Sequence, residues 1–293
     1  MSETEIAAVK FKILEKMTNN DEIKEMVKQK YSEIALQDQD TNASSCCGSG
    51  GCSTEVYNIM SDGYDHLGGY TAEADLKLGC GLPTEFAKIQ PGNLVVDLGS
   101  GAGNDCFVAR HETGEIGKVI GVDFTPAMID KARINAEKLG FNNVEFRLGD
   151  IESLPITANV VDVVVSNCVM NLVPDKPKAF AEVFRILKSG GHFSISDIVL
   201  TGALPEKIKN AAEMYAGCVA SAILMSDYLQ IIKNTGFTNI TLQKQKPIIV
   251  PTDILKNYLS DDEIMAYNSQ STNIQSITVY AEKQDSCCDP NCC

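Results

Sequence analysis

Residues 94–103 read LVVDLGSGAG, an apolar run followed by an aspartate and by glycines at every second position. The apolar run predicts a buried strand. Gly99, Gly101 and Gly103 predict a tight turn that opens into a helix and lets the backbone approach a ligand closely. We therefore expect the chain to be organised around a cradle for a small polar ligand at this turn.

Beyond this stretch, strand and helix patterns alternate, which predicts an α/β fold with a parallel sheet and crossover helices. Further strands are expected at 118–122, 144–148, 160–166, 192–200, 239–244 and 276–282. Helices are expected at 125–139, at 175–187 with Gly190-Gly191 as its stop, and at 205–235, and residues 4–36 read as two amphipathic helices broken at 18–21. We divide the chain into an N-terminal helical cover with a flexible cysteine-bearing segment (1–65), a main domain (66–283) whose substrate-side region covers about 200–283, and a cysteine-rich tail (284–293).

Charge and composition limit the partners of the chain. Its 293 residues carry a formal net charge of -14, which argues against nucleic acid or an anionic membrane surface and favours a small substrate. No apolar run approaches the roughly 18 to 20 residues that cross a bilayer, so we expect a cytoplasmic protein without a membrane partner.

Cysteine is unusually frequent, with eleven residues, whereas histidine occurs three times. In a reducing compartment such cysteines favour reactive, metal-binding or redox roles over structural disulfides. The scarcity of histidine argues against a histidine-based catalytic apparatus. The cysteines stand at 46, 47, 52, 80, 106, 168, 218, 287, 288, 292 and 293.

Two aspartates follow the second and third expected strands. Asp123 lies 20 residues beyond Gly103, where a carboxylate can accept hydrogen bonds from two ribose hydroxyls, and Asp150 precedes Ile151, a pair suited to an adenine amino group and ring face. The glycine spacing is GxGxG rather than the GxGxxG of dinucleotide sites. Either aspartate alone is more often a cap or a solvated residue, but the two in this order favour a nucleoside site.

The motifs DLGSGAG, VDFTP, GDIE and RILKSGG resemble the class I S-adenosylmethionine-dependent methyltransferases. The resemblance implies a Rossmann-like, seven-stranded, mostly parallel sheet with helices on both faces and an antiparallel last strand. It also implies S-adenosylmethionine as cofactor. The cofactor-binding residues we predict are Asp97, Gly99, Ser100, Gly101, Gly103, Asp123, Phe124, Met128, Asp150, Ile151 and Asn167.

Single cysteines near this site can be read in two ways. Cys168 directly follows the fourth strand, where a group facing the cofactor would lie, yet a core role is equally compatible with the residue alone. Cys218 stands among small residues of a helical stretch, and its two interpretations are balanced in the same way. Cys106 lies on an apolar helix face, which favours the core.

A more specific resemblance covers residues 45–240. SNCVMNLVPDK, YAGCVASA, LGCGLP and the early cysteine pair, in this order around the glycine turn, are similar to the arsenite methyltransferases. The resemblance implies that Cys80, Cys168 and Cys218 hold trivalent arsenic, while Cys46 and Cys47 take part in thiol exchange. It implies arsenite and methylated arsenicals as substrates and glutathione or thioredoxin as reductant, and we expect a monomer.

The chemistry of arsenic agrees with this set. Trivalent arsenic is soft and prefers thiolates, which leave its lone pair free, so the protein need supply no general base. Methylation formally oxidises arsenic, and a disulfide between Cys46 or Cys47 and Cys80 would return it to the trivalent state.

Two other functions remain open at this point. One is methylation of carbon or oxygen in a small quinone-like metabolite, with structural cysteines. The other is a metalloid-binding protein without turnover. The vicinal thiol pairs of the tail, Cys287-Cys288 and Cys292-Cys293, fit either arsenic delivery or a disordered end.

Overall fold

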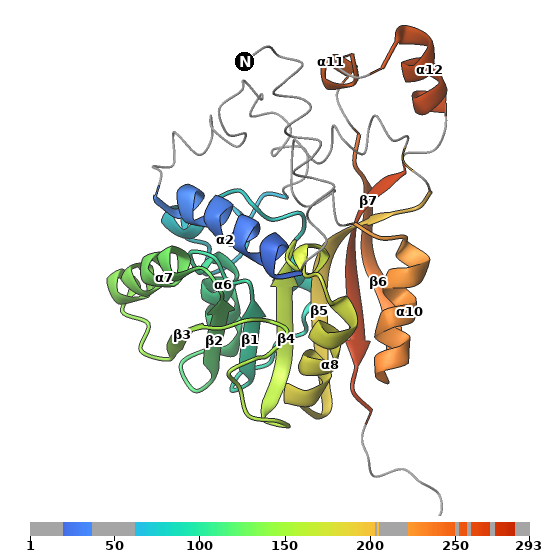
Figure 1. Ribbon diagram of the computed structural model, residues 1–293. Coiled ribbons are helices and arrows are strands. Elements are labelled where there is room, and N and C mark those ends of the chain that lie inside the picture. The colour runs from blue at the N-terminus through green and yellow to red at the C-terminus, as the bar shows by residue number, and fades with distance from the viewer. Residues whose placement is uncertain are drawn as a thin grey trace, which may run out of the picture.

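The computed structural model describes residues 20–36, 62–202, 204, 222–249, 252–256, 259–269 and 273–284. Within them lies a seven-stranded sheet in the order β3-β2-β1-β4-β5-β7-β6 (Figure 1). The strands β1 to β5 run parallel, and β7 pairs antiparallel with β5 and β6, as predicted. The strands are β1 (Leu94–Leu98), β2 (Lys118–Asp123), β3 (Val144–Leu148), β4 (Val161–Asn167), β5 (Leu187–Leu200), β6 (Thr238–Pro247) and β7 (Ile274–Glu282).

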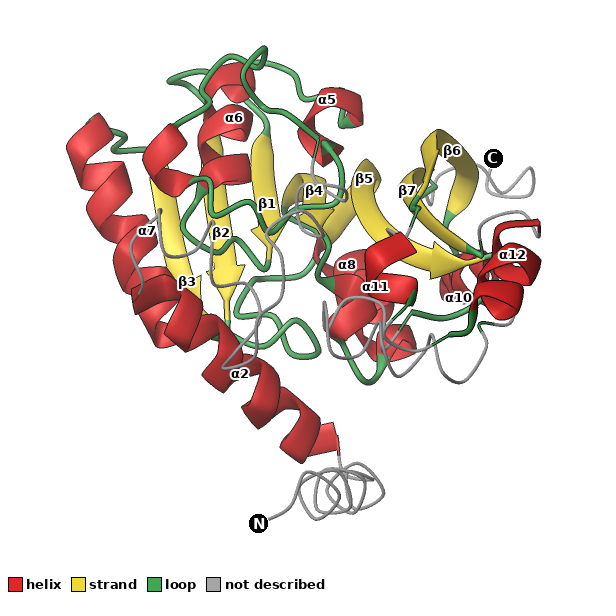
Figure 2. Ribbon diagram, turned by 90° about the horizontal axis from the view of Figure 1, so that it is seen from above, coloured by secondary structure: helices red, strands yellow, loops and turns green. Residues whose placement is uncertain are grey.

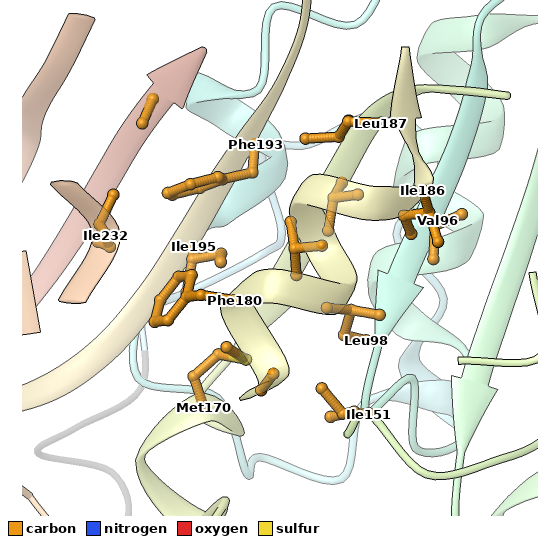
Figure 3. Packing of buried hydrophobic residues seen from close by; sticks show 14 of the residues in the cluster. Val96, Leu98, Ile151, Met170, Phe180, Ile186, Leu187, Phe193, Ile195 and Ile232 are labelled. Atoms are coloured by element: carbon orange, nitrogen blue, oxygen red, sulfur yellow. The ribbon is translucent and has the colours of Figure 1, made fainter. Parts of the chain in front are cut away.

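Helices cover both faces of the sheet, which explains why β1 and β4 are apolar along most of their length. The helices α6 (Asn104–Thr113) and α7 (Pro126–Leu139) pack on one face, where Phe107 and Ile129 are buried. The helices α8 (Lys176–Ile186) and α10 (Met225–Thr235) pack on the other face. There Phe180 and Phe193 meet between α8 and β5, together with Ile195 (Figure 3).

The helix α2 (Asn20–Leu36) lies across the end of the sheet at which the parallel strands finish (Figures 1 and 2). Ile34 and Ala35 pack against Met128 at the start of α7, and the Lys131 ammonium donates to the Ala35 carbonyl at 3.2 Å. The second of the two predicted N-terminal helices is therefore present as α2 and packs against α7.

The remaining elements are short. The 3-10 turn η1 (Ala72–Ala74) and the helix α5 (Pro83–Phe86) precede β1, and the 3-10 turn η2 (Met170–Leu172) follows β4. The helices α11 (Thr252–Leu255) and α12 (Asp261–Ser269) precede β7. None of the helices in the described ranges is both long and apolar enough to cross a bilayer.

Two boundary predictions are wrong. The helix expected at 205–235 does not include residues 222–224, because Leu224 pairs with Leu200 and α10 begins at Met225. The other error concerns the start of β5. We expected Gly190-Gly191 to end the helix and β5 to begin at residue 192, but β5 begins at Leu187. Leu187 already pairs with Val161, and the Gly190 N–H bonds the Lys283 carbonyl, so the two glycines belong to the strand. The first predicted helix, the cysteine-bearing segment of 37–61, most of the helical prediction for 205–235 and the tail lie outside the described residues.

Candidate active site

The site lies at the carboxyl edge of the sheet, between β1 and β4. The strand order changes direction there, which is where parallel α/β sheets bind ligands. Gly99 follows β1 with a φ of +68°, and a Cβ added to it would lie 2.4 Å from a methyl carbon of Val169, which follows β4. The glycine is therefore required both by its left-handed backbone and by the close approach of the two loops.

A cavity at this edge collects nearly the whole predicted cofactor set. Gly103 is not part of its wall, and its φ of +102° and the nearby rings of Phe107 and Phe146 explain the glycine there. The α2 side chains Lys24, Val27 and Tyr31 also face the cavity. The predicted residues on the wall are Asp97, Gly99, Ser100, Gly101, Asp123, Phe124, Met128, Asp150, Ile151 and Asn167.

Asp123, at the end of β2, braces the glycine turn. One carboxylate oxygen accepts from the Gly101 N–H at 3.0 Å, and the other accepts from the Thr125 N–H at 2.8 Å. Burial raises the pKa of Asp123, and these N–H donors oppose that shift. Each carboxylate oxygen keeps a further lone pair for hydroxyl donors, so the predicted ribose contact is compatible with the geometry.

Two further carboxyl groups are buried under the turn. Burial, and then the charge of Asp105, raises the pKa of Asp97 well above its ordinary value, and the Cys106 thiol donates to Asp97 at 3.2 Å. Burial raises the pKa of Asp105 to about 6, although hydrogen bonds from Tyr64 and Asn167 favour its ionised form. Cys106 is fully buried, as predicted, and burial followed by the charge of Asp97 raises the pKa of its thiol.

The cavity suits a polar, positively charged ligand. Five aspartates line it, whereas Lys24 is the cationic side chain on its described wall. Within the described residues, Ser100 Oγ and Asn104 Oδ1 are buried at this wall without a hydrogen-bond partner. Such atoms are rare unless a ligand or water satisfies them, so the residues present fit a cofactor with ammonium, hydroxyl and carboxylate groups.

Sequence reasoning missed several wall residues, of which Asn104 and Lys24 are polar side chains of particular interest. Asn104 starts α6 directly after Gly103, and this position next to the turn could have indicated it. Lys24 forms ion pairs with Asp150 at 2.7 Å and with Glu152 at 2.8 Å. Those partners are more than 120 residues away, so no sequence spacing could have indicated the contact. Lys24 thus ties α2 to the aspartate that we expected at the adenine.

Two of the cysteines predicted on the acceptor side, Cys80 and Cys168, lie close to each other. Cys80 and Cys168 belong to one buried cluster with Ile198, Ile248 and Ile274, and Cys168 also lines the cavity. Cys168 has a φ of +60°, a conformation that costs a side-chain-bearing residue about 1–3 kcal/mol and is concentrated at functional sites. Its N–H is held by the Ser196 carbonyl at 2.8 Å.

Asn167 is placed differently from the other predicted cofactor residues. It faces the cavity, but its carboxamide oxygen accepts from the N–H groups of Cys80 at 3.0 Å and Gly81 at 3.3 Å, and its nitrogen donates to the Gly81 carbonyl at 2.8 Å. Its role toward the cofactor therefore stays a prediction.

Cys46, Cys47 and Cys218 lie outside the described residues. Across the part of the chain that the structure describes, no group of three or more histidine, cysteine, aspartate or glutamate side chains could hold a metal ion. Of the three cysteines predicted to hold arsenic, Cys80 and Cys168 are described, and they lie in one buried cluster.

Comparison with known proteins places this site in a family. Residues 89–246 match a methyltransferase domain family. The arsenite methyltransferase of Halobacterium salinarum is 42% identical over 82% of this chain, and the chain spans 62% of that relative's length. The arsenite methyltransferase of Aquipseudomonas alcaligenes is 32% identical, over 81% of this chain and 68% of the relative.

Structural comparison agrees. An arsenic(III) S-adenosylmethionine methyltransferase from Chlamydomonas reinhardtii superposes with a TM-score of 0.59 and 32% identity, covering 71% of this chain and 68% of the other. The fold and the cavity define the class as that of the S-adenosylmethionine-dependent methyltransferases. Within that class, the chain belongs to the arsenite methyltransferase family. The predicted fold class, the predicted family and the cofactor of the family are thereby confirmed.

Proposed function

We propose that this chain methylates trivalent arsenic, using S-adenosylmethionine as methyl donor and cysteine thiolates to hold the arsenic. The observation that carries the proposal is the burial of Cys80 and Cys168 in one cluster at the carboxyl edge, with Cys168 also on the wall of the cofactor cavity. Thiols at this position could bind a soft metalloid directly beside the methyl group of a bound donor.

The donor side would be formed by the glycine turn and its carboxylates. Asp123 would accept the ribose hydroxyls, Asp150 and Ile151 would hold the adenine, and Asn104 and Ser100 offer unsatisfied oxygen atoms to the methionine part. Bound S-adenosylmethionine supplies an electrophilic methyl group on a sulfonium centre. The aspartates of the wall favour this cationic ligand over its neutral product.

The acceptor side would need no acid–base residue. Each cysteine thiol exchanges for a hydroxide of arsenite, one arsenic–oxygen bond breaks as one arsenic–sulfur bond forms, and the thiol proton leaves with the hydroxide as water. Arsenic keeps its lone pair and its trivalent state in this exchange. The protein then contributes by holding donor and acceptor together, which can be worth up to several kcal/mol.

The finer parts of the proposal concern residues beyond the described ranges. Cys218 would be the third thiolate, and Cys46 or Cys47 would close a disulfide with Cys80 to reduce the arsenic again after methylation. Glutathione or thioredoxin would restore these thiols. Detoxification of arsenic in the cytoplasm, by a monomer, is the biological setting that we propose.

Serine substitutions test the role of the thiols. We expect Cys168→Ser and Cys218→Ser each to abolish methylation of arsenite while the affinity for S-adenosylhomocysteine stays within about twofold, since neither removes a predicted cofactor contact. Cys80→Ser should retain more activity on methylarsonous acid than on arsenite, because that substrate needs fewer thiols.

Cys106→Ser is the matched control. Cys106 is equally buried, but its thiol contacts Asp97 rather than the cluster of Cys80 and Cys168, and a serine hydroxyl can keep that hydrogen bond. The control should keep wild-type turnover. Arsenite methylation that survives both Cys168→Ser and Cys218→Ser would reject thiolate binding and leave a quinone-like substrate with structural cysteines as the better explanation.

A further inference from the structure

The segment 79–81, Gly-Cys-Gly, carries Cys80 to the neighbourhood of Cys168 without belonging to a helix or strand. A catalytic thiol on such a loop needs external support, because its position sets the spacing of the two sulfur atoms. We infer that Asn167 is the positioning residue that clamps this loop, so that one carboxamide next to Cys168 in the chain fixes Cys80. The inference rests on the proposed function, because Cys80 needs a fixed position only if it holds arsenic. Its test does not depend on that function, because the alkylation rates are measured without arsenic or cofactor.

The hydrogen bonds of Asn167 satisfy the loop backbone as a neighbouring strand would. Its Oδ1 accepts from both N–H groups, of Cys80 and Gly81, and its Nδ2 donates to the Gly81 carbonyl. The Cys80 carbonyl accepts from Ser276 Oγ at 2.6 Å. The backbone on both sides of the Cys80 thiol is therefore held by side chains from two strands, β4 and β7.

A buried group in turn holds Asn167. One hydrogen of its Nδ2 bonds the Gly81 carbonyl, and the other is shared between Tyr64 Oη at 2.5 Å and Asp105 Oδ2 at 3.2 Å. The Tyr64 hydroxyl donates to the same carboxylate at 2.8 Å. Tyr64 and Asp105 are buried, so water does not compete for these bonds. The carboxamide is thus oriented on both sides, as a positioning group must be.

The glycines of the loop show how closely it is pressed against this support. A Cβ at Gly79 would lie 2.6 Å from Asn167 Nδ2, and a Cβ at Gly81 would lie 2.6 Å from Ser196 Oγ. The Ser196 carbonyl also holds the N–H of Cys168. The loop that carries Cys80 and the turn that carries Cys168 are therefore held by the same two neighbouring strands, β4 and β5.

Alkylation of the cysteines tests the clamp directly in the full-length protein without arsenic or cofactor. Native protein, kept reduced by a phosphine, is treated with iodoacetamide, and the rates at Cys80 and Cys106 are followed by peptide mass spectrometry. Both thiols are fully buried, so Cys106 reports loosening of the whole fold. We expect Asn167→Ala to raise the rate at Cys80 at least about tenfold and to leave Cys106 unchanged, since several hydrogen bonds to the loop are lost.

Two further variants make the result specific. Gly79→Ala adds a methyl group on the loop that would collide with the Asn167 carboxamide. It should therefore raise the alkylation rate of Cys80 while residue 167 stays asparagine. It also carries the test if Asn167→Ala does not fold. Asn143→Ala is the matched control, because its carboxamide also bonds loop carbonyls, of Gly114 and Gly117, at the opposite end of the strands. It should change neither rate.

Binding measurements separate positioning from cofactor binding. Asn167→Ala should weaken binding of phenylarsine oxide about tenfold and change the affinity for S-adenosylhomocysteine less than twofold. A large loss of S-adenosylhomocysteine affinity with unchanged Cys80 alkylation would overturn the inference and make Asn167 a cofactor residue. Equal rises at Cys80 and Cys106 in both variants would overturn it as well. Wild-type protein that does not bind phenylarsine oxide would refute the proposed function, and the alkylation rates would still decide the role of Asn167.

Discussion

The contact between the glycine turn and the Cys168 turn can be tested by adding one methyl group. Gly99 and Gly101 both have left-handed backbones, with φ of +68° and +51°. A Cβ at Gly99 would lie 2.4 Å and 2.7 Å from the two methyl carbons of Val169, whereas a Cβ at Gly101 has no atom within 4 Å. Alanine at either position is therefore strained by the left-handed backbone, but only alanine at residue 99 also clashes with Val169.

The difference in stability follows from these contacts. The left-handed backbone costs alanine about 1–2 kcal/mol at either site. Overpacking against Val169 adds about 1–3 kcal/mol at residue 99 alone. Since about 1 kcal/mol corresponds to roughly 2–4 °C in a domain of this size, Gly99→Ala should unfold roughly 2–12 °C below Gly101→Ala.

Differential scanning calorimetry without cofactor measures this difference free of any effect on ligand binding. Val169→Ala provides the internal check, because it removes the methyl groups that the new Cβ would meet. In the double variant it should recover most of the extra loss caused by Gly99→Ala, giving a favourable coupling energy of about 1–3 kcal/mol. Equal melting temperatures for the two alanine variants, or no coupling with Val169→Ala, would refute the reasoning.

Two further predictions concern charged groups of the site. Lys24→Met removes the ion pairs to Asp150 and Glu152, so amide hydrogen exchange in α2 should accelerate about threefold to tenfold. Lys28→Met is the control, because it loses only a long ion pair with Glu25 and should leave the exchange unchanged. Equal effects of the two variants would contradict docking of α2 through Lys24. The fold raises the pKa of Asp105 to about 6 from an ordinary 3.8, so its contribution to stability is full below about pH 4 and is lost as the pH rises through 6. Relative to Asp105→Asn, the wild type should therefore lose up to about 3 kcal/mol between pH 4 and pH 8 in chemical unfolding, and a stability difference independent of pH would contradict the burial of an ionisable Asp105.

The features that the sequence predicted well are those with a local cause. Strands such as β4 are continuous apolar runs because helices cover both faces, and Gly99 was recognisable because a left-handed turn after a strand needs glycine. Asp123 and Asp150 could be placed because parallel strands bring their carboxyl ends to one edge. The same argument placed Cys168 beside the cavity.

The features that the sequence did not predict depend on contacts between distant segments. The hydrogen bonds of Tyr64 to Asp105 and of Asn167 to the Cys80 loop join residues that are 41 and 87 positions apart, so no spacing indicates them. Asn167, the last residue of β4, was predicted at the cofactor, but the direction of its carboxamide depends on the loop that packs against it. The start of β5 was missed because a double glycine usually ends a helix, whereas here the backbone of β7 pairs across it.

Transfer of a labelled methyl group tests the central claim most directly. Wild-type protein is incubated with arsenite, a thiol reductant and S-adenosylmethionine carrying a trideuterated methyl group, and the arsenic species are separated and weighed by mass spectrometry. We predict trideuterated methylarsenic species that form in step with S-adenosylhomocysteine and that are missing with Cys168→Ser. Formation of S-adenosylhomocysteine without labelled arsenic, or no turnover when arsenite and thiol are present, would contradict methylation of arsenic by this chain.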